Sequence, residues 1–346
     1  MTSAFSNSVE VKITDTTEAA SSFGIGAGYE VYPFDISLCI LGTNTKTEPL
    51  DGYTVTISLP VPEKLPDEKE RISIVHRSDD GTVTTLISQL KQINGVWYLV
   101  FEATEFSTYA LVVSNMGTYD ETVGLPYYAD SNGNEVFIGF AANGKYIAHS
   151  GVTVLFKENQ KSFTDTGTHW AKGYIKFVAE RELFNGTGIN KFSPDTSVTR
   201  AMFATVIGRL FERGYGEIET MSSHAFTDCD YDEYYGKYVD RAAENGILDG
   251  YGNGKFGPGD AVTREQIEAI LYRFADFLDA LPDDIDSSLR YPDSGDISNW
   301  AESAALYCQS TGTITGRDGG SFVPQGTATR AEAAAIIRRF IESILA

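Results

Sequence analysis

Cysteine is scarce in this chain, and long apolar segments are missing from it. The three cysteines lie in different segments, without the CxxC spacing of a zinc or redox site: Cys39, Cys229 and Cys308. No segment is long and apolar enough to span a membrane. We therefore expect no disulfide framework, no metal, no cofactor and no membrane insertion. The first ten residues lack the features of a signal peptide, so an exported protein with this sequence would be a fragment of a longer precursor.

Basic residues are also few. Lys and Arg number 27 against 48 Asp and Glu, which gives a formal net charge of −21. This excludes nucleic acid as a partner bound through bulk electrostatics. Charges more than about 8 Å apart are screened at physiological salt, so a small basic groove can still hold an anion. A hydrophobic content of 42% indicates a globular chain, and 346 residues are enough for two or three domains.

The C-terminal half contains a threefold repeat. Its units open at Phe163-Thr164-Asp165, Phe226-Thr227-Asp228 and Tyr291-Pro292-Asp293, so the openings are 63 and 65 residues apart. Each unit continues through an aromatic residue (Trp170, Tyr234, Trp300) to a Gly-containing turn and a Phe-x-Pro triplet. Six residues after each proline stands an Arg preceded by Thr, at Arg200, Arg264 and Arg330. Identical offsets indicate three copies of one structural unit.

Each Thr-Arg pair predicts the start of a helix. The Thr is an N-cap, and Gln266 and Glu332, three residues after it, complete capping boxes in units two and three. Unit one carries Met202 at this position and keeps only the Thr. Apolar residues follow at helical spacing in all three units. Because a unit of this size cannot bury its apolar stripe alone, we expect three long helices to pack into one body.

The first third of the chain predicts β-structure. Apolar residues alternate with Thr and Ser from Tyr53 to Leu59, as in a half-buried strand. Segments 71–76, 82–86 and 96–101 are likewise predicted to be strands. Turns at Asp79-Asp80-Gly81 and Asn94-Gly95 separate them. Short strands at even spacing favour an antiparallel sandwich.

These patterns predict a multidomain chain of the β plus α class. Residues 1–114 form an Ig-like antiparallel β-sandwich. Residues 115–160 form a linker and a small β-element with a hairpin turn at Asn132-Gly133. The helical repeats then occupy residues 161–219, 220–284 and 285–346.

The repeat motifs resemble the S-layer homology repeat over about residues 161–346. The resemblance implies an all-α, pseudo-threefold body with a central three-helix bundle, whose inter-repeat grooves bind secondary cell-wall polysaccharide, usually pyruvylated. It implies an extracellular protein at the cell wall, with surface-layer proteins as further neighbours. It places Arg200, Arg264 and Arg330 in the grooves, Trp170 and Trp300 at the aromatic position, and Asp165, Asp228 and Asp293 at the opening acid.

Simple chemistry supports these roles but leaves alternatives open. An Arg in the first turn of a helix offers a planar fork and the positive helix end to a sugar carboxylate. On this basis Arg330→Ala is expected to weaken glycan binding without unfolding the protein. For the two Trp residues, core packing competes with stacking on a sugar ring. For the three Asp residues, capping of a turn competes with ligand contact.

We therefore expect a binding protein and not an enzyme. Its repeats would hold a secreted surface protein non-covalently on a wall glycan. One alternative is the anchoring fragment of a surface glycoside hydrolase whose catalytic domain is absent here. The other is an adhesin whose β-sandwich binds carbohydrate or protein.

Overall fold

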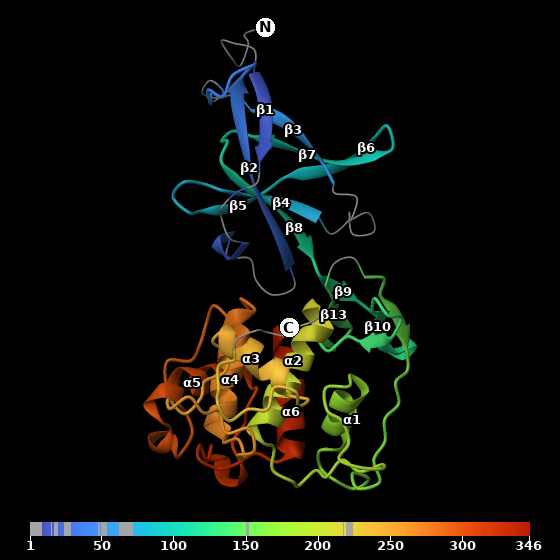
Figure 1. Ribbon diagram of the computed structural model, residues 1–346, viewed down its shortest axis with the longest axis vertical. Coiled ribbons are helices and arrows are strands. Elements are labelled where there is room, and N and C mark those ends of the chain that lie inside the picture. The colour runs from blue at the N-terminus through green and yellow to red at the C-terminus, as the bar shows by residue number, and fades with distance from the viewer. Residues whose placement is uncertain are drawn as a thin grey trace. The chain divides into compact units, whose positions relative to one another are not determined.

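The computed structural model forms two compact units (Figure 1). It describes residues 9–14, 16, 20–23, 29–47, 49, 54–61, 72–149, 152–216, 218 and 224–346. The first unit comprises residues 1–116 and 149–151, and the second comprises residues 117–148 and 152–346. The β-element after the first unit therefore belongs to the same compact body as the helical repeats.

The first unit consists of two antiparallel sheets. Its strands are β1 (Val9–Thr14), β2 (Tyr29–Ile40), β3 (Val55–Pro60), β4 (Ile72–Arg77), β5 (Val83–Leu86), β6 (Ser88–Ile93), β7 (Val96–Ala103) and β8 (Thr108–Ser114). One sheet has the order β1-β2-β8-β4-β5, and the other has the order β3-β7-β6. The antiparallel β-structure predicted for this part of the chain is confirmed.

A single hydrophobic cluster takes side chains from both sheets of the first unit. Ile74 and Leu111 come from the five-stranded sheet, and Leu99 and Phe101 come from the three-stranded sheet. Alternation in the strands places these residues on one face of each sheet. The predicted turn at Asn94-Gly95 is confirmed between β6 and β7, where both residues have positive φ.

The second unit begins with small sheets built from β9 (Met116–Thr118), β10 (Leu125–Ala129), β11 (Glu135–Phe137), β12 (Ala141–Ala142), β13 (Lys145–Ile147) and β14 (Leu155–Lys157). The predicted hairpin turn lies between β10 and β11, with Gly133 at φ 81°. Buried Arg181 of the first repeat donates through Nε to the Ala141 carbonyl oxygen at 2.8 Å. This bond joins the β-element to the helices.

Each repeat supplies one short and one long helix. The short helices are α1 (Lys172–Glu180), α3 (Gly236–Glu244) and α5 (Glu302–Thr311). The long helices are α2 (Arg200–Tyr215), α4 (Arg264–Phe277) and α6 (Arg330–Ile344). The long helices begin where the Thr-Arg pairs predict, with Thr199, Thr263 and Thr329 as N-caps. Both predicted capping boxes form, with Gln266 and Glu332.

The repeats close into a ring. Helix α3 packs on α2, α5 packs on α4, and α1 of the first repeat packs on α6 of the last. Thus each short helix covers the long helix of the repeat before it. The segments before the long helices form a cycle of backbone hydrogen bonds, from Val198 N to Ala328 O, Ala328 N to Val262 O, and Val262 N to Val198 O, at 2.9, 3.2 and 2.9 Å.

Within the described part of the chain, none of the helices combines the length and apolar character needed to cross a bilayer.

Candidate functional site

The first Arg of each long helix holds two repeats together. Arg200 donates through Nε to Phe256 O and through Nη2 to Asp249 O, both at 2.7 Å, in the second repeat. Arg264 makes the same pair of bonds to Phe322 O and Thr315 O in the third repeat. Arg330 makes them to Phe192 O and Asn185 O in the first repeat. The three side chains therefore link the repeats in a closed circle.

These guanidinium groups are buried, but not all of their nitrogen atoms form hydrogen bonds. Arg200, Arg264 and Arg330 are 4%, 3% and 5% exposed, and burial lowers the pKa of all three. Each lies 4.5–5.1 Å from the ring of the Phe whose carbonyl it binds. Among the described residues, Nη1 of each has no hydrogen-bond partner. One guanidinium nitrogen per repeat junction is therefore available for a further hydrogen bond.

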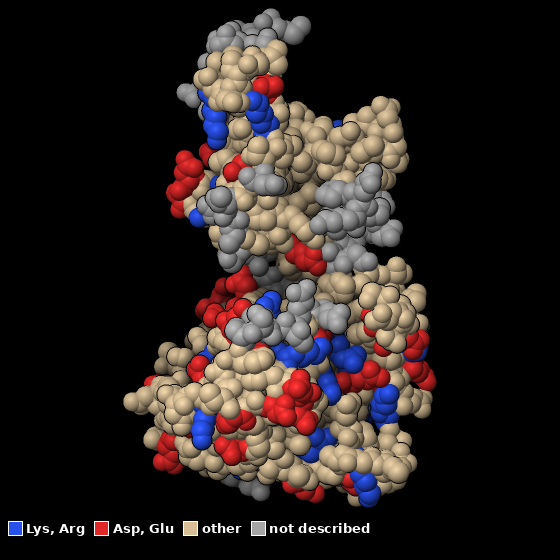
Figure 2. Space-filling view, viewed as in Figure 1, with Lys and Arg blue, Asp and Glu red and all other residues tan. Residues whose placement is uncertain are grey.

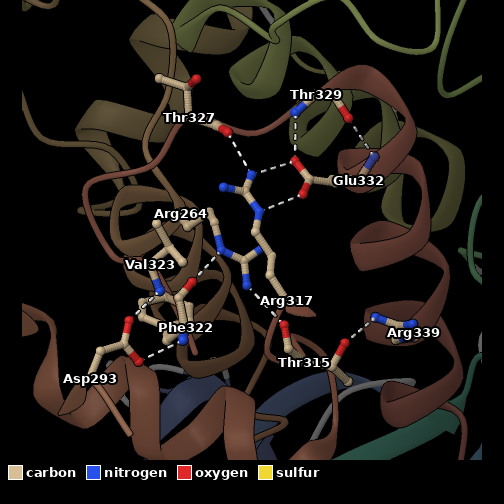
Figure 3. A network of polar contacts seen from close by, with 10 residues as sticks. All are labelled: Arg264, Asp293, Thr315, Arg317, Phe322, Val323, Thr327, Thr329, Glu332 and Arg339. Carbon is tan, nitrogen blue, oxygen red and sulfur yellow. Dashed lines mark hydrogen bonds and ion pairs between the residues drawn. The ribbon is translucent and has the colours of Figure 1, made fainter. Parts of the chain in front are cut away.

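The opening Asp of each repeat clamps the Phe-x-Pro turn of the same repeat. Asp293 accepts hydrogen bonds from Phe322 N and Val323 N, both at 2.7 Å (Figure 3). Val323 has φ 57°, which a β-branched residue avoids unless it is held there. Burial opposes ionisation of Asp293, but the two N–H donors outweigh burial and lower its pKa.

The other two opening acids make the equivalent bonds. Asp165 accepts from Phe192 N and Ser193 N, and Asp228 accepts from Phe256 N and Gly257 N. Their pKa values are lowered in the same way, against the opposing effect of burial. Of the two roles considered for these residues, the turn cap is the one that the contacts describe. None of the three carboxylates lines the grooves described next.

Three grooves lie at equivalent positions around the ring, and each takes residues from all three repeats. Each combines the first Arg of one repeat, the Gly turn and long helix of the next, and an aromatic residue of the remaining one. Groove 1 contains Arg330, Gly186, Arg209 and Tyr234. Groove 2 contains Arg200, Gly250, Arg273 and Trp300. Groove 3 contains Arg264, Gly316, Arg339 and Trp170. Their volumes are about 450, 350 and 370 Å³.

The aromatic residues of the grooves are exposed. Trp170, Tyr234 and Trp300 are 61%, 52% and 55% exposed. Core packing, the alternative considered for the two Trp residues, is therefore wrong. An exposed indole or phenol ring at the edge of a polar groove provides a flat face on which a sugar ring can stack. Tyr234, at which the second repeat departs from the Trp pattern, occupies the same place as the two Trp residues.

A second Arg in each groove was missed by the sequence reasoning. Arg209, Arg273 and Arg339 stand nine residues after the first Arg of their helices, and this constant offset was the available signal. Arg209 donates to Leu183 O at 3.3 Å, and Arg339 donates to Thr315 Oγ1 at 3.3 Å. Arg273 instead pairs with the Asp249 carboxylate at 2.6 Å.

Groove 3 carries a third guanidinium group. Arg317, in its Gly turn, donates through Nε and Nη2 to the two Glu332 carboxylate oxygens, both at 2.8 Å (Figure 3). Glu332 also accepts from Thr329 N at 2.9 Å, as the N3 member of the capping box. One carboxylate therefore caps α6 and fixes Arg317 beside Arg264, and the Arg317 contact lowers the Glu332 pKa against the effect of burial.

Comparison with known proteins identifies the repeats. The S-layer homology domain model matches residues 162–204, 226–267 and 290–334. An amylopullulanase of Thermoanaerobacterium thermosulfurigenes is 31% identical over 230 residues, which is 64% of this chain and 12% of that protein. Exoglucanase XynX of Acetivibrio thermocellus is 31% identical over 181 residues, 52% of this chain and 16% of the enzyme.

A cellulosome-anchoring protein of Acetivibrio thermocellus is 33% identical over 119 residues, which is 34% of this chain and 26% of that protein. The chain thus spans about a quarter or less of the length of each of these three relatives. The segments that the family model matches lie in the three repeats that carry the Arg residues and the Asp clamps. The chain therefore carries three S-layer homology domains between residues 162 and 334.

Proposed function

We propose that the three grooves bind an anionic secondary cell-wall polysaccharide and so anchor a surface protein non-covalently at the cell exterior. A pyruvylated sugar is the ligand unit that we favour, because its ketal presents one carboxylate on a pyranose ring. The repeats would act as a pseudo-threefold body with the long helices at its centre. The two sheets of the first unit would form an Ig-like sandwich that serves as a spacer or display stalk.

One observation carries this proposal: three equivalent grooves each bring two Arg residues and an exposed aromatic ring together. Guanidinium groups bind carboxylates through a planar pair of donors. An aromatic face adds stacking against the apolar side of a sugar ring. Folding alone requires the first Arg of each helix, but it gives no reason for an exposed ring and a second Arg at the same place three times.

An excess of positive charge is found locally in the grooves, whereas the protein as a whole is acidic. Acidic and basic side chains are interspersed over the face of the molecule seen in Figure 2. In groove 1, Arg209 and Arg330 give a net charge of +2 from two cations and no carboxylate. In groove 3, three Arg residues and Glu332 also give +2. With a net protein charge of −21, these local sites account for anion binding better than long-range attraction does.

The similarity to longer enzymes favours one version of this function. The amylopullulanase and the exoglucanase match this chain over only 12% and 16% of their own lengths. We propose that the repeats anchor a catalytic or display segment of a larger surface protein in the same way. The chain described here would supply the anchor and no catalytic step.

Sedimentation with purified wall sacculi tests the proposal. The double variant Arg209→Ala/Arg339→Ala removes the second Arg from grooves 1 and 3 and leaves the buried Arg residues in place. We expect it to lose at least tenfold in affinity, since each removed charge-assisted contact contributes about 1.5 kcal/mol or more. Arg290→Ala, which removes an exposed Arg paired with Asp286 outside the grooves, is the control. Equal pelleting of the double variant and the control would contradict the proposal.

A further inference from the structure

One difference between groove 2 and the other two grooves is the residue before the glycine of its turn. The residue before the glycine is Asp249 in groove 2, whereas Asn185 and Thr315 occupy this place in grooves 1 and 3. All three use their backbone carbonyl to accept a hydrogen bond from the first Arg of the preceding repeat. The backbone is therefore held alike in all three grooves, and only the side chain changes.

The Asp249 carboxylate pairs with Arg273, whereas the equivalent Arg residues of the other grooves remain available for a ligand. Its Oδ2 lies 2.6 Å from Nη1 of Arg273, with the Asp and Arg side chains 67% and 32% exposed. Arg209 and Arg339, at the equivalent position, donate to uncharged oxygens at 3.3 Å. Two cations and one carboxylate leave groove 2 with a net charge of +1, against +2 for the others. An incoming carboxylate would have to displace Asp249 and would also be repelled by it.

Groove 2 also contains a second exposed aromatic ring. Tyr251 is 49% exposed and follows the glycine of the turn, where grooves 1 and 3 carry Thr187 and Arg317. Its hydroxyl donates to the Asp260 carboxylate at 3.0 Å, and the Arg200 guanidinium lies 4.8 Å from its ring centre. The Tyr251 ring is thereby fixed in the same groove as Trp300.

We infer that groove 2 takes an uncharged sugar residue of the wall glycan, and that Asp249 excludes the anionic unit from it. This inference rests on the proposed glycan binding by grooves 1 and 3. Two aromatic faces suit the apolar sides of a pyranose ring. The Arg273–Asp249 pair supplies adjacent donors and an acceptor for hydroxyl groups, and the Gln266 amide in the same groove supplies both kinds.

The test uses sacculi in two forms, native and with their carboxyl groups reduced to alcohols. Asp249→Asn installs the residue that groove 1 carries. We expect it to raise affinity for native sacculi about fivefold, because an exposed ion pair of this kind no longer competes for Arg273. Binding to reduced sacculi should not rise in this variant, because they present no carboxylate to Arg273 and the replaced carboxylate no longer accepts from sugar hydroxyl groups. On reduced sacculi the parent protein should keep weak binding that Trp300→Ala removes and Trp170→Ala does not.

The two proposals fail in different ways. If Arg209→Ala/Arg339→Ala binds native sacculi like the parent, the proposal that grooves 1 and 3 bind the anionic sugar is wrong. If that double variant loses binding but Asp249→Asn has unchanged affinity for native sacculi, the exclusion by Asp249 is wrong. If residual binding to reduced sacculi survives Trp300→Ala, or is lost equally in Trp170→Ala, groove 2 is not the site of the uncharged sugar.

Discussion

Replacement of Arg330 by Ala should destabilise the repeats as well as weaken glycan binding. The side chain is 5% exposed and donates to Phe192 O and Asn185 O at 2.8 and 2.7 Å. Hydrogen bonds from charged donors contribute about 1.5–3 kcal/mol each, so the loss of two should be roughly 3–6 kcal/mol. The expectation from sequence, that this variant weakens binding without unfolding, therefore needs revision. A loss of this size is a large part of the stability of a typical domain.

Urea unfolding followed by tryptophan fluorescence measures this loss. A Trp97→Phe background leaves Trp170 and Trp300, so that the signal reports on the repeats alone. Arg330→Lys keeps the charge but loses the planar fork, and should fall between the parent and Arg330→Ala. Arg209→Ala removes one 3.3 Å bond and should cost less than about 1 kcal/mol. If the free energy of unfolding of Arg330→Ala lies within about 0.5 kcal/mol of the parent value, the closure of the ring by buried Arg residues is refuted.

Three further predictions concern acidic residues. Asp293→Ala should lower the free energy of unfolding by about 1–3 kcal/mol, measured in urea, because two N–H groups lose their acceptor and Val323 loses its clamp. Asp165, Asp228 and Asp293 have lowered pKa values in the folded state, so their stabilisation is present above the unfolded pKa of about 3.8 and lost as pH falls through the lower folded values. Circular dichroism from pH 5 to pH 2 should show this acid unfolding. Burial raises the pKa of Glu268 to about 9, so the folded state holds a proton that the unfolded state releases near pH 4.5. Stability should therefore fall as pH rises from about 4.5 to 9, and Glu268→Gln should flatten the dependence of Tm on pH over that range.

Much of the fold could be predicted because its signals are local. Capping residues and apolar spacing fixed the starts of α2, α4 and α6, and alternation identified β3 and β7. Strand β6 was missed because it is exposed along most of its length and its alternation is weak. Strand β2 contains Pro33, which pairs with Ala110 of β8 and lies beyond Asp35, where the described pairing with β1 ends. The proline thus takes an edge position, as expected for proline in a strand.

The site was harder to predict because its contacts are long-range. The identical offsets pointed to Arg200, Arg264 and Arg330, and these residues do line the grooves. Spacing could not show that each guanidinium is bound to backbone carbonyls of another repeat, since those bonds depend on ring closure. It also could not separate the turn role of Asp293 from a ligand role, because the Val323 conformation that calls for a clamp appears only in three dimensions.

Ring closure makes the three grooves depend on one another. Deletion of residues 285–346 would remove Arg339 and the Gly turn of groove 3. It would also remove Trp300 from groove 2 and Arg330 from groove 1. It would also uncover the face of α1 that packs on α6. We therefore expect a chain of residues 1–284 to lose sacculus binding completely, where a chain of independent repeats would keep about two thirds of its sites. Retention of substantial pelleting by the shortened chain would show that single repeats bind alone, and that the composite grooves are not the binding sites.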